Sequence, residues 1–136
     1  MRVTSVVVGL ALAGALATPA IAQDFKLTSP SVAEGAPLSP AQVFKGFGCD
    51  GGNTSPHLSW SNAPTGTKSF AVTAYDPDAP TGSGWWHWNV VNIPATVSEL
   101  AAGASGSTAV HAGASELKND YGVPGFGGAC QPPGEV

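Results

Sequence analysis

The segment Tyr75–Trp88, which reads YDPDAPTGSGWWHW, gathers side chains that could bind or transform a small molecule. Asp76 and Asp78 supply carboxylates, and His87 supplies an imidazole among three tryptophans. Charged residues make up only 10% of the chain, whereas they form about 25% of an average domain. Because charge is scarce elsewhere, this cluster is the first candidate for a functional site.

The DPDAP loop admits two interpretations. Pro77 and Pro80 fix the backbone and remove two donors, so the loop is expected to be rigid and to follow the end of a strand. Asp76 and Asp78 could then simply accept hydrogen bonds from nearby backbone N–H groups, as aspartates in turns often do. Alternatively, they face a ligand.

His87 favours the second interpretation, although a histidine on a strand is often only a core residue. Strict alternation along the strand places His87 on the face opposite Trp86 and Trp88. An aspartate at the end of a neighbouring strand would orient the ring and stabilise its protonated form. A partly buried imidazolium beside free backbone N–H groups would attract an anion.

Short strands must position these residues, because frequent Gly and Pro disfavour long helices. The last two candidate strands are apolar on both faces, which predicts central strands covered on both sides. The chain after Pro94 lacks a sustained apolar period, and we expect the core to be incomplete at the C-terminal end. The expected strands are Phe25–Ser29, His57–Ser61, Ser69–Tyr75 and Trp86–Ile93.

Two further features lie outside this cluster. Cys49 and Cys130 favour a disulfide, with free thiols as one alternative and a metal site as the weaker one, since neither belongs to a CxxC pair. Gly125–Gly128 could be a flexible tail or a loop whose bare backbone approaches a ligand. A disulfide at Cys130 would pin this loop and favour the second interpretation.

The first residues are typical of an export signal. Arg2 precedes an apolar stretch over Val3–Ala17, and Ala20-Ile21-Ala22 is a cleavage site of the small-x-small type. About 15 apolar residues fall short of the roughly 20 needed to span a bilayer. We expect residues 1–22 to be removed, residues 23–136 to form one domain, and the product to be periplasmic or secreted.

The net charge of the chain argues against binding to nucleic acid. The net charge is −4, and the few lysines are scattered, so a basic face for nucleic acid is not expected. No cofactor is predicted either.

Four motifs in register resemble the phosphatidylethanolamine-binding protein family, in its bacterial Raf-kinase-inhibitor-like branch. The resemblance covers about Phe25–Gly134, nearly all of the expected mature chain. The motifs are CDGGNTSPHLSW (Cys49–Trp60), DPDAP (Asp76–Pro80), WWHWNVVNIP (Trp85–Pro94) and NDYG…GFGG.C.PPG (Asn119–Gly134).

The resemblance implies a mainly β fold, a β-sandwich with few short helices. It also implies a small pocket that accepts phosphate-like head groups or acetate. Carried over by motif, Asp76 and His87 resemble the pocket's aspartate and histidine. Trp85 resembles its wall, Gly128 the loop that lines its opening, and Asp78 and Pro80 the supporting residues. The two cysteines resemble the pair found in exported bacterial members.

The sequence departs from the family in two places. The family continues after the PPG loop into an H-R-Y motif with a second pocket histidine, whereas this sequence ends at Val136. Ala129 replaces a proline that usually follows the loop glycine. The first departure agrees with a core that looks incomplete at the C-terminal end.

Three functions remain open. The first is an exported, non-enzymatic protein that binds a small anion and modulates an unknown protein target. The second is a hydrolase that uses Asp76, Asp78 and His87, although no nucleophile accompanies them. The third is an interaction protein whose pocket is vestigial.

Overall fold

The computed structural model describes residues 24–107, 110 and 113–131 and shows strands, but no helix, among them. The expected signal segment and the PPG motif at residues 132–134 lie outside the described residues. The strands are β1 (Lys26–Thr28), β2 (Lys45–Gly46), β3 (Cys49–Asp50), β4 (Leu58–Ser61), β5 (Ser69–Asp76), β6 (Trp85–Pro94), β7 (Glu99–Leu100) and β8 (Ser115–Glu116).

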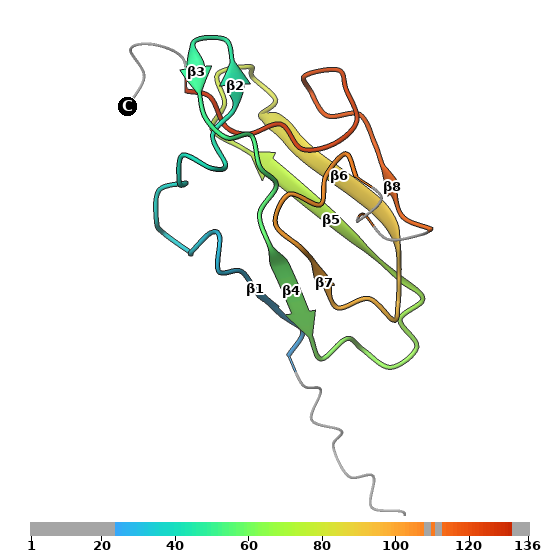
Figure 1. Cartoon of the computed structure of the whole chain (residues 1–136). Coiled ribbons are helices and arrows are strands. Elements are labelled where there is room, and N and C mark those ends of the chain that lie inside the picture. Colours follow the sequence, from blue (N-terminus) through green and yellow to red (C-terminus); the bar gives the residue numbers. More distant parts are fainter. Residues whose placement is uncertain (1–23, 108–109, 111–112, 132–136) are drawn as a thin grey trace, which may run out of the picture.

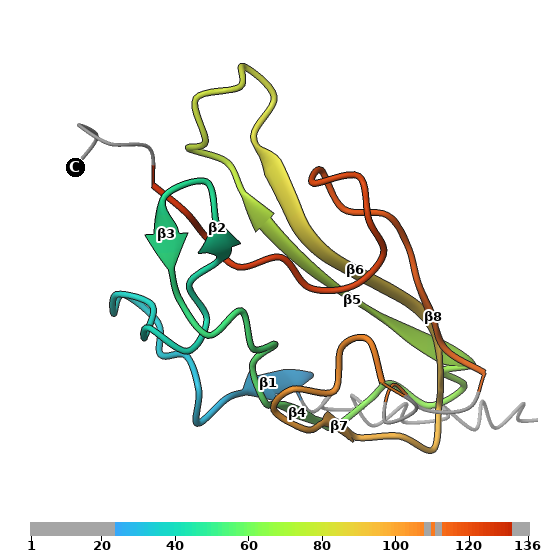
Figure 2. The same ribbon diagram turned by 45° about the horizontal axis from the view of Figure 1, so that its top comes forward.

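Two three-stranded sheets form the body of the fold, one with the order β1-β4-β7 and the other with the order β5-β6-β8. They lie in two layers, and the small β2-β3 hairpin stands at one end (Figure 1 and Figure 2). The buried apolar side chains come from both layers and meet between them, so the core is that of a β-sandwich. They are Leu58, Trp60, Trp88, Val90, Ile93 and Leu100.

The four strands expected from alternation are present, and their bounds shift by no more than a residue or so. Among the described residues, β6 is central in its sheet, as expected, whereas β5 has a strand on one side only, so a central position for β5 stays a prediction. One face of β5 is exposed at Ala71 and Thr73.

The β5-β6 pair contains two irregularities, and both lengthen β6 relative to β5. Between the pairs Ala74–Trp88 and Tyr75–Trp86, one step along β5 corresponds to two steps along β6. The extra residue is His87. A bulge of this kind turns side chains away from strict alternation and is common beside functional sites.

The structure contains the predicted disulfide between Cys49 and Cys130, whose Cα atoms are 5.8 Å apart. It joins β3 to the glycine-rich loop across a sequence separation of 81 residues. The same loop forms a parallel bridge between Ala129 and Val43. The segment before Cys130 is thus attached to the body of the fold, which rules out the flexible-tail interpretation of Gly125–Gly128.

Candidate functional site

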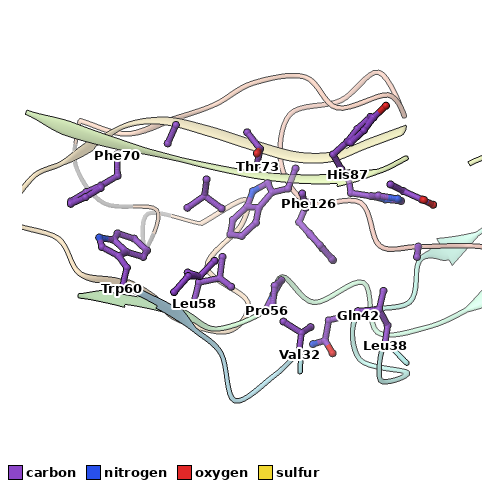
Figure 3. A pocket seen from close by; sticks show the side chains of 18 of the residues that line it. Val32, Leu38, Gln42, Pro56, Leu58, Trp60, Phe70, Thr73, His87 and Phe126 are labelled. Atoms are coloured by element: carbon purple, nitrogen blue, oxygen red, sulfur yellow. The ribbon is translucent and has the colours of Figure 1, made fainter. Parts of the chain in front are cut away.

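His87 lies at one end of an apolar cavity of about 610 Å³ between the two sheets. Figure 3 shows its imidazole near Phe126, whereas Phe70 and Trp60 close the far end. Asp76 and Pro77 line the same cavity. Two polar side chains of the sequence cluster, those of Asp76 and His87, therefore reach one partly open cavity, as in many ligand sites.

The bulge explains how His87 faces this cavity. Strict alternation predicted that His87 would face away from Trp88, but both residues line the cavity. The extra residue in β6 rotates the backbone between them, so the prediction of opposite faces is wrong.

The backbone of the glycine-rich loop holds the imidazole. Nδ1 of His87 lies 2.7 Å from the carbonyl oxygen of Gly127, and the N–H of Gly127 donates to the carbonyl of His87 at 2.8 Å. We expected Asp76 to orient the ring, but the structure gives that role to Gly127. A carbonyl only accepts, so Nδ1 carries the proton.

The other ring nitrogen of His87 is free to meet a ligand. Nε2 is buried and has no hydrogen-bond partner among the described residues. In the neutral ring Nε2 is an acceptor, and in the protonated ring it is a donor. A buried polar atom without a partner is costly, so a bound group that satisfies it would be stabilised.

Trp85 offers a second unsatisfied group in the same region. Its indole Nε1 is buried without a partner in the described part of the chain, and an indole N–H can only donate. The Trp85 and His87 rings both lie beside the Tyr121 ring, with centroids 5.1 and 6.2 Å from it. Two unsatisfied nitrogens thus share one aromatic neighbour.

Tyr121 was missed by the sequence analysis, although it connects most parts of the site. Its hydroxyl donates to the carbonyl of Gly128 at 2.8 Å, and its ring stacks on Phe44 with centroids 4.2 Å apart. Burial raises the pKa of the Tyr121 phenol above its ordinary value. A tyrosine within the NDYG motif was the available signal, but nothing in its spacing indicated these contacts.

Gly128 packs too closely for any larger residue. A Cβ atom there would overlap the backbone of Gln42 and Phe44. The N–H of Gly128 donates to Oδ1 of Asn53 at 2.7 Å, so its amide is occupied within the protein. The structure therefore shows Gly128 as a packing position that holds the loop in place.

The DPDAP loop divides into a part that lines the cavity and a part that does not. Oδ1 of Asp76 accepts the N–H of Asp78 at 2.9 Å, which is the turn interpretation of this aspartate. Asp76 is half-buried and also lines the cavity, while Asp78 and Pro80 are exposed and are not among the lining residues. The structure therefore brings Asp76 and His87 to one cavity and leaves Asp78 outside it.

Gln42 is a further polar residue that sequence reasoning missed. It is 4% exposed and lines the cavity, and its Oε1 accepts a hydrogen bond from Ser39 at 2.6 Å. Nothing in the flanking sequence marks it.

The described residues contain no group of three or more His, Cys, Asp or Glu side chains that could hold a metal ion. The cavity offers the unsatisfied Nε2 of His87 in largely apolar surroundings, whereas Trp85, whose Nε1 is also unsatisfied, does not line the cavity and is linked to it through the shared Tyr121 neighbour. Such an arrangement suits a small oxygen-rich group better than a cation, because an indole N–H can only donate.

Similarity to known proteins identifies the family of this chain. A family model described as phosphatidylethanolamine-binding protein matches residues 28–136. This chain belongs to the phosphatidylethanolamine-binding protein family. The resemblance found in the sequence, including its bacterial branch, is confirmed.

Three relatives show how far the similarity extends. The UPF0098 protein YbcL of Escherichia coli K12 is 60% identical over 113 residues, which are 82% of this chain and 62% of YbcL. Its crystal structure superimposes with a TM-score of 0.81 at 58% identity, covering 84% of this chain and 71% of that one. YbhB of the same organism is 52% identical over 82% of this chain and 71% of its own length. LppC, named as a lipoprotein of Mycobacterium tuberculosis, is 39% identical over 86% of this chain and 53% of its own.

The chain thus spans about three fifths of the length of YbcL, and the shared fold is a mainly β one, as expected. Among the residues that the structure describes, no helix is long and apolar enough to cross a membrane.

Proposed function

We propose that this member of the phosphatidylethanolamine-binding protein family is an exported binding protein that takes a small oxyanion, a phosphate or a carboxylate such as acetate, at His87. One observation carries the proposal: Nε2 of His87 is buried without a partner, while Nδ1 is committed to the carbonyl of Gly127. Asp76, Trp85 and the loop around Gly128 would shape the site, with Asp78 and Pro80 supporting the loop from outside.

Because Nδ1 of His87 already donates to the carbonyl of Gly127, an oxyanion at Nε2 requires a second proton on the ring. An oxyanion can accept a hydrogen bond from Nε2 only when His87 is protonated, because neutral Nε2 is itself an acceptor. Trp85 Nε1 could donate to a second oxygen in either state. Anion affinity should therefore be higher for the protonated ring than for the neutral one.

Binding is favoured over hydrolysis by the placement of the acidic groups. The hydrolase alternative needs Asp76, Asp78 and His87 to act together, but Asp78 is exposed and does not line the cavity. Both cysteines are in a disulfide and supply no nucleophile. We therefore propose a function without turnover, and we leave any protein target unspecified.

Two observations support export from the cytosol. A disulfide persists in oxidising compartments and is rare in the cytosol. One relative carries the name "Putative lipoprotein LppC", which supports a place outside the cytosol for this chain as well. Together with the signal-like start of the sequence, these observations favour a periplasmic or secreted protein.

The test is calorimetric titration of the chain with phosphate and with acetate, comparing His87→Gln with His57→Gln. His57 is a matched control, because its Nδ1 is also buried without a partner, yet it does not line the cavity. We expect His87→Gln to weaken binding at least about tenfold, as a charge-assisted hydrogen bond is worth about 1.5–3 kcal/mol. Equal affinity in the two variants would contradict the assignment.

A further inference from the structure

Glu116 of β8 connects segments that are distant in sequence through its carboxylate. Its Oε1 accepts hydrogen bonds from Nε1 of Trp88 at 2.7 Å and from the hydroxyl of Ser105 at 2.6 Å. Its Oε2 accepts the N–H of Gly106 at 2.8 Å. β8 pairs with β6, and Glu116 lies opposite Val90 in that pair (Figure 1). Hydrogen bonds to an ionised carboxylate are stronger than those between neutral groups, so this side chain holds its three partners firmly.

Ser105 extends this network to the glycine-rich loop. Its hydroxyl oxygen accepts the N–H of Phe126 at 2.7 Å, while its hydrogen is donated to Glu116. A serine hydroxyl has one hydrogen and a carboxylate only accepts, so the direction of both hydrogen bonds is fixed. With the hydrogen turned to Glu116, a lone pair of the hydroxyl oxygen is available to Phe126. Hydrogen bonds arranged in such a chain polarise and strengthen one another.

The two residues held by Glu116 flank the contact that positions the His87 ring. Trp88 follows His87 in β6, and Phe126 precedes Gly127 in the loop. His87 and Gly127 exchange two hydrogen bonds, one through Nδ1 of the ring and one through the backbone N–H of Gly127. The rings of Trp88 and Phe126 also meet edge to face, with centroids 5.8 Å apart. Glu116 therefore ties together both sides of the contact that fixes Nδ1.

Close packing brings the backbone of the loop directly onto Ser105. Gly125 is buried and has a φ of 101°, a conformation that favours glycine. A Cβ atom on Gly125 would lie only 2.9 Å from Oγ of Ser105. Nδ2 of Asn119, a residue that is 4% exposed, donates to the carbonyl of Gly125 at 2.9 Å. The start of the loop is thus held on one side by Asn119 and on the other by the Ser105 hydroxyl.

We propose that Glu116 and Ser105 are positioning residues for His87. The carboxylate orients the serine hydroxyl, the hydroxyl holds the N–H of Phe126, and the carbonyl of Gly127 is thereby presented to Nδ1. The proton of the neutral ring is then kept on Nδ1, and Nε2 is left for the anion. The inference rests on the proposed function only for its effect on anion affinity, because the position of the ring proton can be measured without a ligand.

NMR of the His87 ring nitrogens in the oxidised chain tests the proposal. The neutral ring of the unmodified chain should carry its proton on Nδ1. Ser105→Ala should give a mixture of the two tautomers, because the Gly127 carbonyl is no longer held in place. Ser107→Ala is the matched control and should keep the proton on Nδ1, because its hydroxyl donates to the carbonyl of Ala104 at 2.8 Å, within the same turn. A tautomer unchanged in Ser105→Ala, or a mixture of equal size in both variants, would overturn the proposal.

Two variants of Glu116 separate orientation of the hydroxyl from a general loss of stability. Glu116→Gln keeps an acceptor oxygen for Ser105 and should leave the His87 proton mainly on Nδ1. Glu116→Ala removes the acceptor and should reproduce the tautomer mixture of Ser105→Ala. An equal mixture in the Gln and Ala variants would contradict the orienting role. Thermal unfolding identifies a variant that does not fold, and Ser105→Ala, which removes only the hydroxyl oxygen, then decides the outcome.

Titration with phosphate separates this inference from the proposed function. Ser105→Ala should weaken phosphate binding about fivefold, as expected for one ordinary hydrogen bond, and Ser107→Ala should not. If the tautomer changes as expected but His87→Gln leaves phosphate affinity unaltered, the positioning role stands and the anion site is wrong. If His87→Gln weakens binding but Ser105→Ala keeps the ring proton on Nδ1, the anion site stands and the positioning role is overturned.

Discussion

His87 has its two ring nitrogens in different environments, and this asymmetry underlies the account of the site. Nδ1 is held at 2.7 Å by the carbonyl of Gly127, and Nε2 is buried with no partner among the described residues. The sequence proposed His87 as a site residue, which stays a prediction, and it assigned the orienting role to Asp76. The true partner is a backbone carbonyl 40 residues away in sequence, which residue types cannot reveal.

Both interpretations of the DPDAP loop apply to Asp76. Its carboxylate accepts the N–H of Asp78, as a turn residue would, and it also lines the cavity. Asp78 and Pro80 are exposed instead, so motif resemblance alone does not separate residues that face the cavity from those that hold the loop.

Tyr121 yields a prediction on alkaline stability. Burial raises its folded pKa above 10.0, so the folded state keeps the phenol proton to higher pH than the unfolded chain does. The contribution of this pKa shift to the free energy of unfolding is therefore fully present below pH 10. It is lost as pH rises through the pKa of Tyr121 in the folded state. Urea unfolding at about pH 8 and about pH 11 should show a drop in unfolding free energy that is smaller in Tyr121→Phe.

Tyr75→Phe is the control for this comparison, because Tyr121 remains and the alkaline drop should persist. At about pH 8, Tyr121→Phe should lower the unfolding free energy by about 1 kcal/mol, through loss of the hydrogen bond to Gly128. An alkaline drop of equal size in both variants would show that Tyr121 is not its source.

At the scale of elements, alternation predicts long strands well and short ones poorly. β5 and β6 have enough residues for a period to be visible. β2, β3, β7 and β8 have two residues each. β7 and β8 pair with the distant strands β4 and β6, whereas β2 and β3 pair with each other in a short hairpin. The bulge at His87 has no signal in the sequence either, because both faces of the strand carry large residues.

The glycine-rich loop is the element that the disulfide positions, and a double variant tests this. Replacing Cys49 and Cys130 by serine removes a link across 81 residues, worth up to about 4–5 kcal/mol on the chain-entropy model. Thermal unfolding of the double variant should show a clearly lower Tm, or no cooperative transition at all.

Reduction of the unmodified chain is the internal control. It should lower the Tm to that of the double serine variant, whereas the variant should not respond to reductant. A variant as stable as the oxidised parent would mean that the hydrogen bonds of the loop suffice without the disulfide.

At the scale of the whole molecule, two thin sheets share one core, and an apolar cavity lies between them. The weak apolar pattern after Pro94 predicts a core that is incomplete at the C-terminal end, and this stays a prediction.

An NMR measurement of the His87 ring nitrogens, with and without millimolar phosphate, tests the anion site most directly. We expect the neutral ring to be protonated at Nδ1. Phosphate should shift the Nε2 signal to the value of a protonated, hydrogen-bonded nitrogen, while the His57 signals stay in place. An Nε2 signal that ignores phosphate, or a ring protonated at Nε2 alone, would contradict the proposed anion site.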